Sequence, residues 1–290
     1  MLKKLPSAHR ALAELKGILG TLPDAEILLN TLPLQEAKDS SAVENIITTH
    51  DELFRAAVQA DAPTTQAAKE VQNYAAALQL GFELIRKHGF LSSNHLVQIQ
   101  QELEHNQAGY RRLPGTSLKN AQTGEVVYTP PQDYAVVLAL MSNLEQYLND
   151  DELSDADPLV KMAVLHFQFE SIGLRLPAVH PFYDGNGRTG RILNILYLVL
   201  KGLLDLPVLY LSRFITQHKA DYYRHLQQVR DTGAWEPWLL YLIAGVEQTA
   251  KETIALINAM RQLMQEARQQ LRGYRFYSQD LLDHLFREVV

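Results

Sequence analysis

A stretch of sixteen residues, Val179 to Asn194, concentrates side chains that could carry out chemistry on phosphates; its sequence is VHPFYDGNGRTGRILN. His180 can accept a proton from a hydroxyl at neutral pH. Asp184 offers the hard oxygen ligands that Mg²⁺ prefers. Arg188 and Arg191 can each present a fork of donors to phosphate oxygens. Alone, His180 would more often be a hydrogen-bonded loop residue and Asp184 a turn former. Their combination indicates a polyphosphate site with a base and a metal ligand beside it.

The backbone that carries these side chains is expected to change from loop to helix. Pro181 and Gly185 interrupt any helix, so residues 180–186 should form a loop, whereas the apolar run that begins at Ile192 predicts a buried helix. The glycines then lie where the loop enters the helix. Unpaired N–H groups and the positive end of the helix dipole favour an anion there, and glycine lets a phosphate approach the backbone closely.

Two common nucleotide-binding patterns overlap this stretch. Residues 185–190 match G-x-G-x-x-G, and Asp205 follows about twenty residues later, as in dinucleotide-binding folds. No strand is expected before them, however, and the chain lacks a pattern of alternating strands and helices, so this is the weaker interpretation. The P-loop pattern fails because Arg191 and Ile192 stand where it requires lysine followed by serine or threonine.

Helical periodicity extends over most of the chain, because apolar residues recur at steps of three and four. Helices are expected at residues 12–22, 71–85, 134–148, 160–172, 192–204 and 238–264, with further helical segments at 249–273 and 274–286. The one extended segment is Gly124 to Pro131, where β-branched residues lie between a glycine and two prolines. The predicted fold class is all-α with a short β-hairpin.

Composition narrows the class of protein. A net charge of -6 argues against nonspecific coating of nucleic acid and confines any anion site to a local group of basic residues. The chain has no cysteine, which excludes a thiolate metal site and favours a reducing compartment. Neither the N-terminal sequence nor the longest apolar stretch, residues 192–204, has the pattern of a signal peptide or a membrane span. These features favour a cytoplasmic protein without a membrane partner.

The residues from His180 to Arg191 resemble the signature of the Fic family, HPFx(D/E)GNGRxxR, at every defined position. Further segments that resemble bacterial Fic proteins are 48–54, 70–74, 109–115, 127–131, 209–212 and 222–230. The resemblance implies a mostly helical Fic fold and transfer of AMP from ATP to a protein hydroxyl, with Mg²⁺ as cofactor. It divides the chain into an N-terminal helical region with an inhibitory motif (1–100), a Fic core (101–245) and C-terminal helices (246–290).

The resemblance also assigns a role to each motif residue. His180 would deprotonate a serine, threonine or tyrosine hydroxyl of the target, which then attacks the α-phosphorus. Asp184 would hold Mg²⁺ between the α- and β-phosphates. Arg188 and Arg191 would grip the β- and γ-phosphates. Three residues would line the anion hole: Gly185, Asn186 and Gly187.

The expected hairpin resembles the flap of the family, whose edge aligns the target segment by strand addition. This mode of binding uses free backbone donors and acceptors rather than particular side chains. Four residues would form the aligning edge: Val126, Val127, Tyr128 and Thr129.

The chain departs from the family pattern just before His180, where Gly173 to Val179 add seven residues. An outward loop would leave His180 in place, because lengthening a surface loop costs little entropy. If the apolar residues of this insertion were buried instead, His180 could be displaced, and a shift of about 1 Å can cost on the order of a hundredfold in rate.

The upstream stretch DSSAVENIITT admits two interpretations. Ser41 and Glu44 have the spacing of a capping box, which predicts a helix that begins at Ser41. Ser40, Glu44 and Asn45 also match the inhibitory motif of Fic proteins, (S/T)xxxE(G/N). In that family the glutamate pairs with the second motif arginine, here Arg191, and keeps ATP from binding productively. Beside an intact signature the inhibitory interpretation is favoured, and both can hold at once.

Other functions stay open on the sequence alone. One is a non-catalytic Fic-fold interaction module whose terminal helices form a homodimer. Another is transfer of UMP, phosphocholine or phosphate, although the intact signature favours AMP. The partner would be a protein target with a hydroxyl side chain, and self-modification is an additional expectation. Residues 274–286 resemble the first helix of a winged-helix module, but the rest of that module does not follow, so DNA binding is unsupported.

Overall fold

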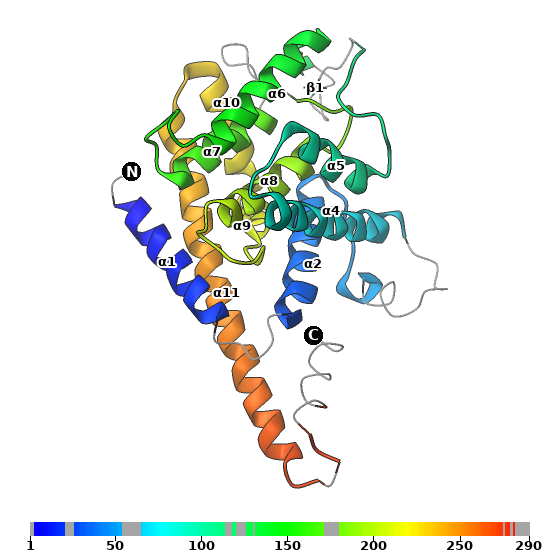
Figure 1. Cartoon of the computed structure of the whole chain (residues 1–290), viewed down its shortest axis with the longest axis vertical. Coiled ribbons are helices and arrows are strands. Elements are labelled where there is room, and N and C mark those ends of the chain that lie inside the picture. Colours follow the sequence, from blue (N-terminus) through cyan, green and yellow to red (C-terminus); the bar gives the residue numbers. More distant parts are fainter. Residues whose placement is uncertain are drawn as a thin grey trace.

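Helices dominate the regular structure of the chain (Figure 1). A computed structural model describes residues 3–20, 26–53, 65–113, 118–119, 126–129, 131–170, 180–274, 276–278 and 281. Its helices are α1 (Lys4–Leu19), α2 (Glu26–Val43), α4 (Gln66–His88), α5 (Ser93–Glu104), α6 (Tyr134–Asn149), α7 (Pro158–Glu170), α8 (Asn186–Leu200), α9 (Leu211–Gln217), α10 (Lys219–Thr232) and α11 (Trp235–Leu271). The predicted all-α class is confirmed.

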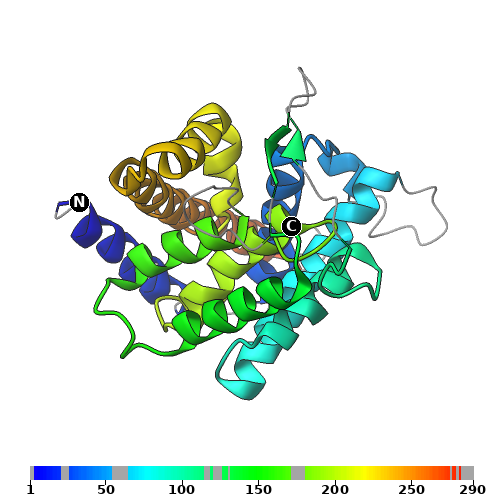
Figure 2. The same ribbon diagram turned by 90° about the horizontal axis from the view of Figure 1, so that it is seen from above.

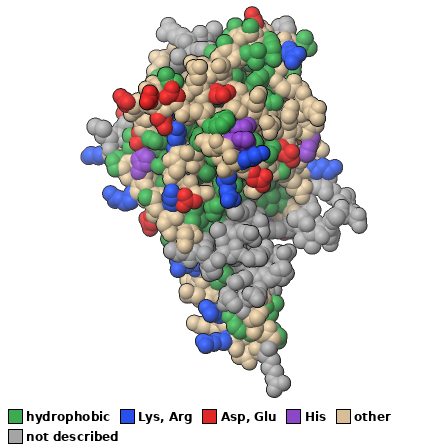
Figure 3. Space-filling model, in the orientation of Figure 1, with side chains coloured by type: hydrophobic (Ala, Val, Ile, Leu, Met, Phe, Trp, Pro, Cys, Tyr) green, Lys and Arg blue, Asp and Glu red, His purple; other side chains and the backbone are tan. Residues whose placement is uncertain are grey.

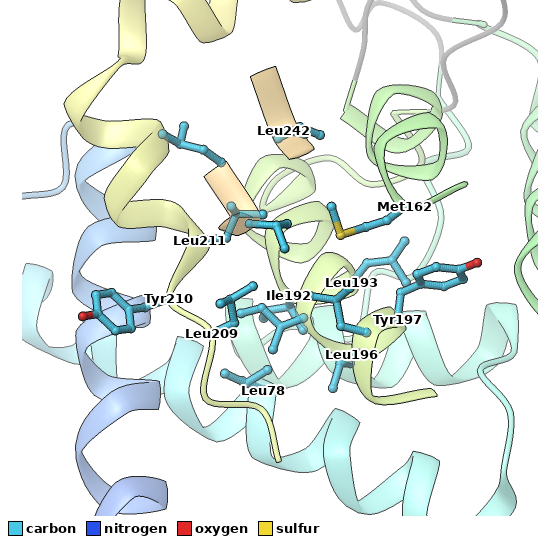
Figure 4. Packing of buried hydrophobic residues seen from close by; sticks show 14 of the residues in the cluster. Leu78, Met162, Ile192, Leu193, Leu196, Tyr197, Leu209, Tyr210, Leu211 and Leu242 are labelled. Atoms are coloured by element: carbon cyan, nitrogen blue, oxygen red, sulfur yellow. The ribbon is translucent and has the colours of Figure 1, made fainter. Parts of the chain in front are cut away.

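Helix α8 lies in the interior with other helices around it (Figures 1 and 2). Residues 188–198 of this helix are all buried. Its side chains Ile192, Leu193 and Leu196 pack among Leu78 of α4 and Met162 of α7 (Figure 4). A helix that is apolar on all sides can bury that surface only in an interior position. The first turn of α8, which carries the motif arginines, is therefore held inside the protein.

The boundaries of α8 differ from the predicted helix at 192–204. The helix begins at Asn186, because the polar residues of its first turn are buried by partners that the periodicity could not reveal. It ends at Leu200, where the Leu203 N–H donates to the Leu198 carbonyl (3.0 Å) and turns the chain back. The predicted helix at 274–286 is not seen at the described residues from Tyr274 to Ser278, whereas Leu281 is helical, and the rest of the segment lies outside the described residues.

Helix α11 is continuous over 37 residues and unites the segments predicted at 238–264 and 249–273. Helix α1 packs along it, and the C-terminal half of α11 extends beyond the other helices (Figure 1). The predicted domain boundary at residue 245 falls within this helix, and the division into domains stays a prediction. None of the described helices has the length and hydropathy needed to cross a bilayer. On the face drawn in Figure 3, the described acidic and basic side chains are interspersed.

Two short strands are paired beside the helices. Strand β1 (Leu118–Lys119) runs antiparallel to β2 (Val126–Tyr128), with Leu118 opposite Tyr128 and Lys119 opposite Val126. Thr129 follows β2 and is exposed. Residues 120–125, which connect the strands, lie outside the described residues, so the complete hairpin and its role as a flap stay predictions.

One face of α2 connects the core to the start of α8. Glu36, Ser40 and Glu44 follow one another at four-residue steps and share this face. Glu36 is 1% exposed. Its carboxylate accepts hydrogen bonds from the Tyr74 hydroxyl (3.0 Å), the Ser212 backbone N–H (2.9 Å) and the Ser212 hydroxyl. These contacts fix the rotation of α2 against α4 and α9, and thereby direct Ser40 and Glu44 toward α8.

Stability should depend on the titration of Glu36. Burial raises the pKa of Glu36 from 4.5 to about 8. Between these two values the folded protein holds a proton that the unfolded chain has released. The free energy of unfolding should therefore fall as pH rises, by up to about 1.4 kcal/mol per pH unit from this one group. Urea unfolding at pH 5, 6.5 and 8 should show a flatter pH dependence for Glu36→Gln than for wild type, and equal slopes would refute this assignment.

Candidate active site

The motif loop is fastened to the core by two of its own side chains. Phe182 is fully buried, and its ring stacks on Tyr110 with centroids 5.3 Å apart. The Asn186 side chain accepts a hydrogen bond from the Phe182 N–H (2.9 Å) and donates one to the Phe182 carbonyl (2.9 Å). The amide of Asn186 thus braces the loop, a role that the sequence interpretation had not given it.

Two glycines permit a close approach of charged side chains to the start of α8. Gly185 is the N-cap residue and has φ +75°, a conformation that favours glycine. A Cβ atom at Gly187 would lie 2.5 Å from Glu44 Oε1 and 3.0 Å from Arg191 Nη1. The backbone at the helix N-terminus is therefore exposed directly to the charged groups around it, as an anion site requires.

Arg188 is enclosed by carboxylates from three different parts of the chain. Its Nε lies 3.0 Å from Glu44, its Nη1 3.0 Å from Glu70 and its Nη2 2.9 Å from Glu104. Glu44 follows α2, whereas Glu70 and Glu104 belong to the core helices α4 and α5. Burial raises the pKa of Glu104 to about 6, although the charge of Arg188 opposes the shift. Each nitrogen of this guanidinium is thus in contact with a carboxylate.

Arg191 is 1% exposed and shares Glu44 with Arg188. Its Nη2 lies 2.6 Å from Glu44 Oε1, and its Nε donates to the Ser40 hydroxyl (2.8 Å). Glu170, at the end of α7, lies 3.5 Å from Nη1. Burial alone would lower the pKa of Arg191, but Glu44 and Glu170 outweigh it and raise that pKa. Glu44 is therefore an ion-pair partner common to both motif arginines.

Glu170 lies beneath the site in surroundings that favour its charged form. Its carboxylate accepts a hydrogen bond from the Tyr222 hydroxyl and lies 3.0 Å from His166 Nε2. Burial would raise the pKa of Glu170, but the hydrogen bond from His166 and the charge of Arg191 lower it to about 2. Arg191 thus keeps one carboxylate neighbour on the core side, whatever happens to Glu44.

His180 stands at the start of the motif loop in an unusual backbone conformation. Its φ is +38°, in the left-handed region, and its carbonyl accepts a hydrogen bond from Arg111 Nε (2.7 Å). Burial lowers the pKa of His180 to about 4, although the charge of Glu170 opposes the shift. The imidazole is therefore neutral at neutral pH and able to accept a proton. Its buried Nδ1 has no hydrogen-bond partner among the described residues.

Asp184 offers an accessible carboxylate at the entrance to α8. The side chain is 77% exposed, and its Oδ1 accepts a hydrogen bond from the Gly185 N–H (2.7 Å). Mg²⁺ usually takes one or two protein carboxylates and completes its shell with water and phosphate oxygens. An exposed carboxylate beside the predicted phosphate site fits such an ion. Within the described part of the chain, no group of three or more His, Cys, Asp or Glu side chains is arranged to hold a metal.

The capping-box interpretation of Ser41 is wrong. Ser41 lies in the last turn of α2, which ends at Val43, so Glu44 follows a helix rather than opening one. Asn45 has φ +65°, and its N–H donates to the Ala42 carbonyl (3.1 Å), which is typical of a helix C-terminus. The same two positions had the spacing of an N-terminal box by coincidence. What the turn achieves is to present Glu44 to the two motif arginines.

The structure brings most of the predicted site residues together. His180, Asp184 and the arginines surround the start of α8, and Ser40 and Glu44 reach them from α2. The insertion Gly173–Val179 lies outside the described residues. Sequence reasoning missed three carboxylates that contact the arginines: Glu70, Glu104 and Glu170. Glu70 lies in a segment that resembles the family, which was the one available signal.

Two family models match the chain. The Fic/DOC family N-terminal model matches residues 2–83, and the Fic/DOC family model matches residues 90–198. The second match contains the motif loop and most of α8, and the first contains α2 with Ser40 and Glu44.

Two proteins named as adenylyltransferases are similar to part of the chain. Protein adenylyltransferase fic-1 of Caenorhabditis briggsae is 31% identical over 120 residues, 41% of this chain and 20% of that protein. Protein adenylyltransferase Fic of Aedes aegypti is 26% identical over 176 residues, 60% of this chain and 32% of that protein. The chain thus spans a third or less of the length of these relatives.

Two crystal structures share the fold. A Fic family protein from Desulfovibrio desulfuricans G20 aligns with a TM-score of 0.63 at 23% identity and covers 87% of this chain and 75% of its own. A Fic domain containing signaling protein from Bacteroides thetaiotaomicron aligns with a TM-score of 0.67 at 16% identity and covers 87% of this chain and 97% of its own. With the family models matched over well more than half of its length, the chain belongs to the Fic/DOC family.

Proposed function

We propose that this protein is an adenylyltransferase that moves AMP from ATP to a serine, threonine or tyrosine hydroxyl of a protein target, and that Glu44 holds it in an inactive state. The observation that carries the proposal is the carboxylate of Glu44, which lies 2.6 Å from Arg191 and 3.0 Å from Arg188 at the start of α8. Two buried arginines beside a helix N-terminus form a site for an anion, and an acidic side chain occupies it.

His180 supplies the base in this proposal. The target oxygen forms a bond to the α-phosphorus, the bond from that phosphorus to the bridging oxygen breaks, and pyrophosphate leaves. The hydroxyl proton passes to the neutral imidazole. Burial holds the pKa of His180 at about 4 in the free protein. The negative charge of bound phosphates should raise that pKa and make His180 a stronger base when the substrate is present.

The arginines and the helix start bind the leaving group. Glu44 must withdraw from both guanidinium groups before phosphate oxygens can take its place, because it accepts a hydrogen bond from Arg191 and its charge lies 3.0 Å from Arg188 Nε. Glu70, Glu104 and Glu170 belong to core helices and would continue to hold the arginines in place. The two relatives described above carry the name protein adenylyltransferase, which supports AMP over other groups.

Asp184 would hold the magnesium ion, which supplies charge neutralisation between the phosphates when it is bound. Replacement of Asp184 by alanine should weaken Mg²⁺-dependent ATP binding by about tenfold or more and leave the melting temperature nearly unchanged, since the side chain is 77% exposed. Calorimetric titration of ATP with and without Mg²⁺ measures the effect. Asp155→Ala, at another exposed aspartate, is the matched control. An unaltered dependence on Mg²⁺ would refute the assignment.

Labelled ATP tests the proposed function. Incubation of the Glu44→Gly protein with ATP, Mg²⁺ and a cell lysate should place label on protein bands, more than wild type does, and mass spectrometry should identify AMP on hydroxyl side chains. A non-catalytic interaction module would transfer no label, and a transferase for UMP or phosphocholine would label only with those donors.

A further inference from the structure

A short segment before β1, residues 110–113, lies alongside the motif loop. We call it the strap. The Tyr110 ring stacks on Phe182, and the Arg111 N–H donates to the Pro181 carbonyl (2.9 Å). Arg111 also donates through Nε to the His180 carbonyl, as described above. The strap therefore contacts three consecutive residues of the loop, His180 to Phe182, through one ring and two hydrogen bonds.

The fourth loop residue, Tyr183, completes the connection. Its hydroxyl oxygen accepts hydrogen bonds from the backbone N–H groups of Arg112 (2.9 Å) and Leu113 (3.1 Å). These two donors lower the pKa of Tyr183. Tyr183 is 48% exposed, so the hydroxyl and not packing is the main attachment to the strap.

The strap contacts the loop at His180, whose backbone has an unfavourable conformation. A φ of +38° is unfavourable for a residue with a side chain, and such a conformation persists only when the surroundings hold it. Arg111 is 1% exposed, and its planar guanidinium fixes the carbonyl of this same residue, His180. Release of that carbonyl would let His180 relax toward an ordinary conformation and move the imidazole.

The strap also leads toward the paired strands. Its last residue, Leu113, precedes β1 (Leu118–Lys119) by a few positions, and β1 pairs with β2. We propose that Arg111 and Tyr183 are positioning residues that keep the backbone of His180 in register with the strands that would align a protein target. The proposal rests on the adenylyltransferase function proposed above, and it assigns to the loop residue Tyr183 a role that its position in the signature leaves unspecified.

The proposal separates nucleotide binding from transfer. Tyr183→Phe removes the acceptor for two N–H groups and should lower the turnover of a protein target on the order of tenfold, less than the hundredfold that a displacement of about 1 Å can cost. The affinity for ATP should stay within about twofold, because the hydroxyl contacts the strap and not the arginines. Arg111→Lys keeps the charge but loses the planar fork, and it should affect turnover more strongly.

Hydrogen exchange of the full chain supplies a readout that does not depend on activity. In Tyr183→Phe, the amides of Arg112 and Leu113 should exchange faster than in wild type. Tyr274→Phe, at another exposed tyrosine, should change neither these amides nor turnover.

Three outcomes would overturn the proposal. The first is unchanged exchange at Arg112 and Leu113, and the second is faster exchange with normal turnover. The third is a loss of ATP affinity equal to the loss of turnover. If wild type and Glu44→Gly transfer no AMP at all, the proposed function has failed, and exchange alone decides whether the strap holds the loop. Tyr183→Phe keeps the test valid if Arg111→Lys does not fold.

Discussion

Replacement of His180 by alanine should lower AMP transfer by about 10²- to 10⁴-fold, the range expected for loss of a general base. Binding of ATP should stay nearly intact, because the phosphates are bound by the arginines and the helix start rather than by the imidazole. The hydrogen bond that Arg111 makes to residue 180 uses the backbone carbonyl, so the alanine variant keeps this contact. Single-turnover kinetics together with calorimetric ATP binding measure the two effects separately.

A control distinguishes loss of the base from loss of structure. His88→Ala removes an exposed histidine at the end of α4 and should leave transfer unchanged. If His180→Ala lost ATP affinity in proportion to its rate, His180 would have a structural role, and the proposed base would have to be sought elsewhere.

Replacement of Glu44 by glycine should have the second largest effect and the opposite sign. A charge-assisted hydrogen bond is worth roughly 1.5–3 kcal/mol, so releasing the carboxylate should favour productive ATP binding by about ten- to over a hundredfold. Arg191 gains a donor for phosphate in this variant, and Arg188 loses a competing negative charge 3.0 Å from its Nε. AMP incorporation into a target or into the protein itself measures the gain.

The melting temperature of Glu44→Gly and the activity of a control variant, Glu152→Gly, complete this test. Glu44 follows the end of α2, so glycine there does not interrupt the helix, but loss of the contact to Arg191 should cost roughly 1.5–3 kcal/mol of stability and lower the melting temperature by several degrees. Glu152→Gly, which removes an exposed carboxylate from the loop after α6, should not raise transfer. A Glu44→Gly protein that is folded but no more active than wild type would contradict autoinhibition.

The chemistry of the motif could be predicted from sequence because it is local. Pro181, Gly185 and the apolar run after Arg191 fix a loop that enters a buried helix, and this geometry alone places both arginines beside a helix N-terminus. The start of α8 could not be placed to the residue, because its first turn is polar in sequence and is buried only through contacts with other helices.

The carboxylates around the arginines could not be predicted because they are not local. Glu70, Glu104 and Glu170 lie on α4, α5 and α7, and no periodicity relates them to the motif. They become neighbours only when these helices pack around α8. The bracing of Phe182 by the Asn186 side chain is local, across one turn of backbone, but the sequence pattern does not specify it.

The misassigned capping box shows how a short pattern fails without its context. The spacing of Ser41 and Glu44 suits either end of a helix, and α2 itself has little amphipathic pattern and contains Pro33, so periodicity did not predict it. Packing determines which end of a helix lies at Glu44. Glu36 anchors the middle of α2, and the C-terminal end of α2 therefore meets α8. The inhibitory interpretation required only the order of side chains along one helical face, which a sequence does record.

The position of the label tests the central claim most directly. Glu44→Gly protein should be incubated with ATP that carries radioactive phosphorus at the α-position and, in parallel, with ATP that carries it at the γ-position. The account predicts label on protein from α-labelled ATP alone, release of pyrophosphate, and loss of both in the Glu44→Gly, His180→Ala double variant. Label from γ-labelled ATP, or no label from either, would contradict it.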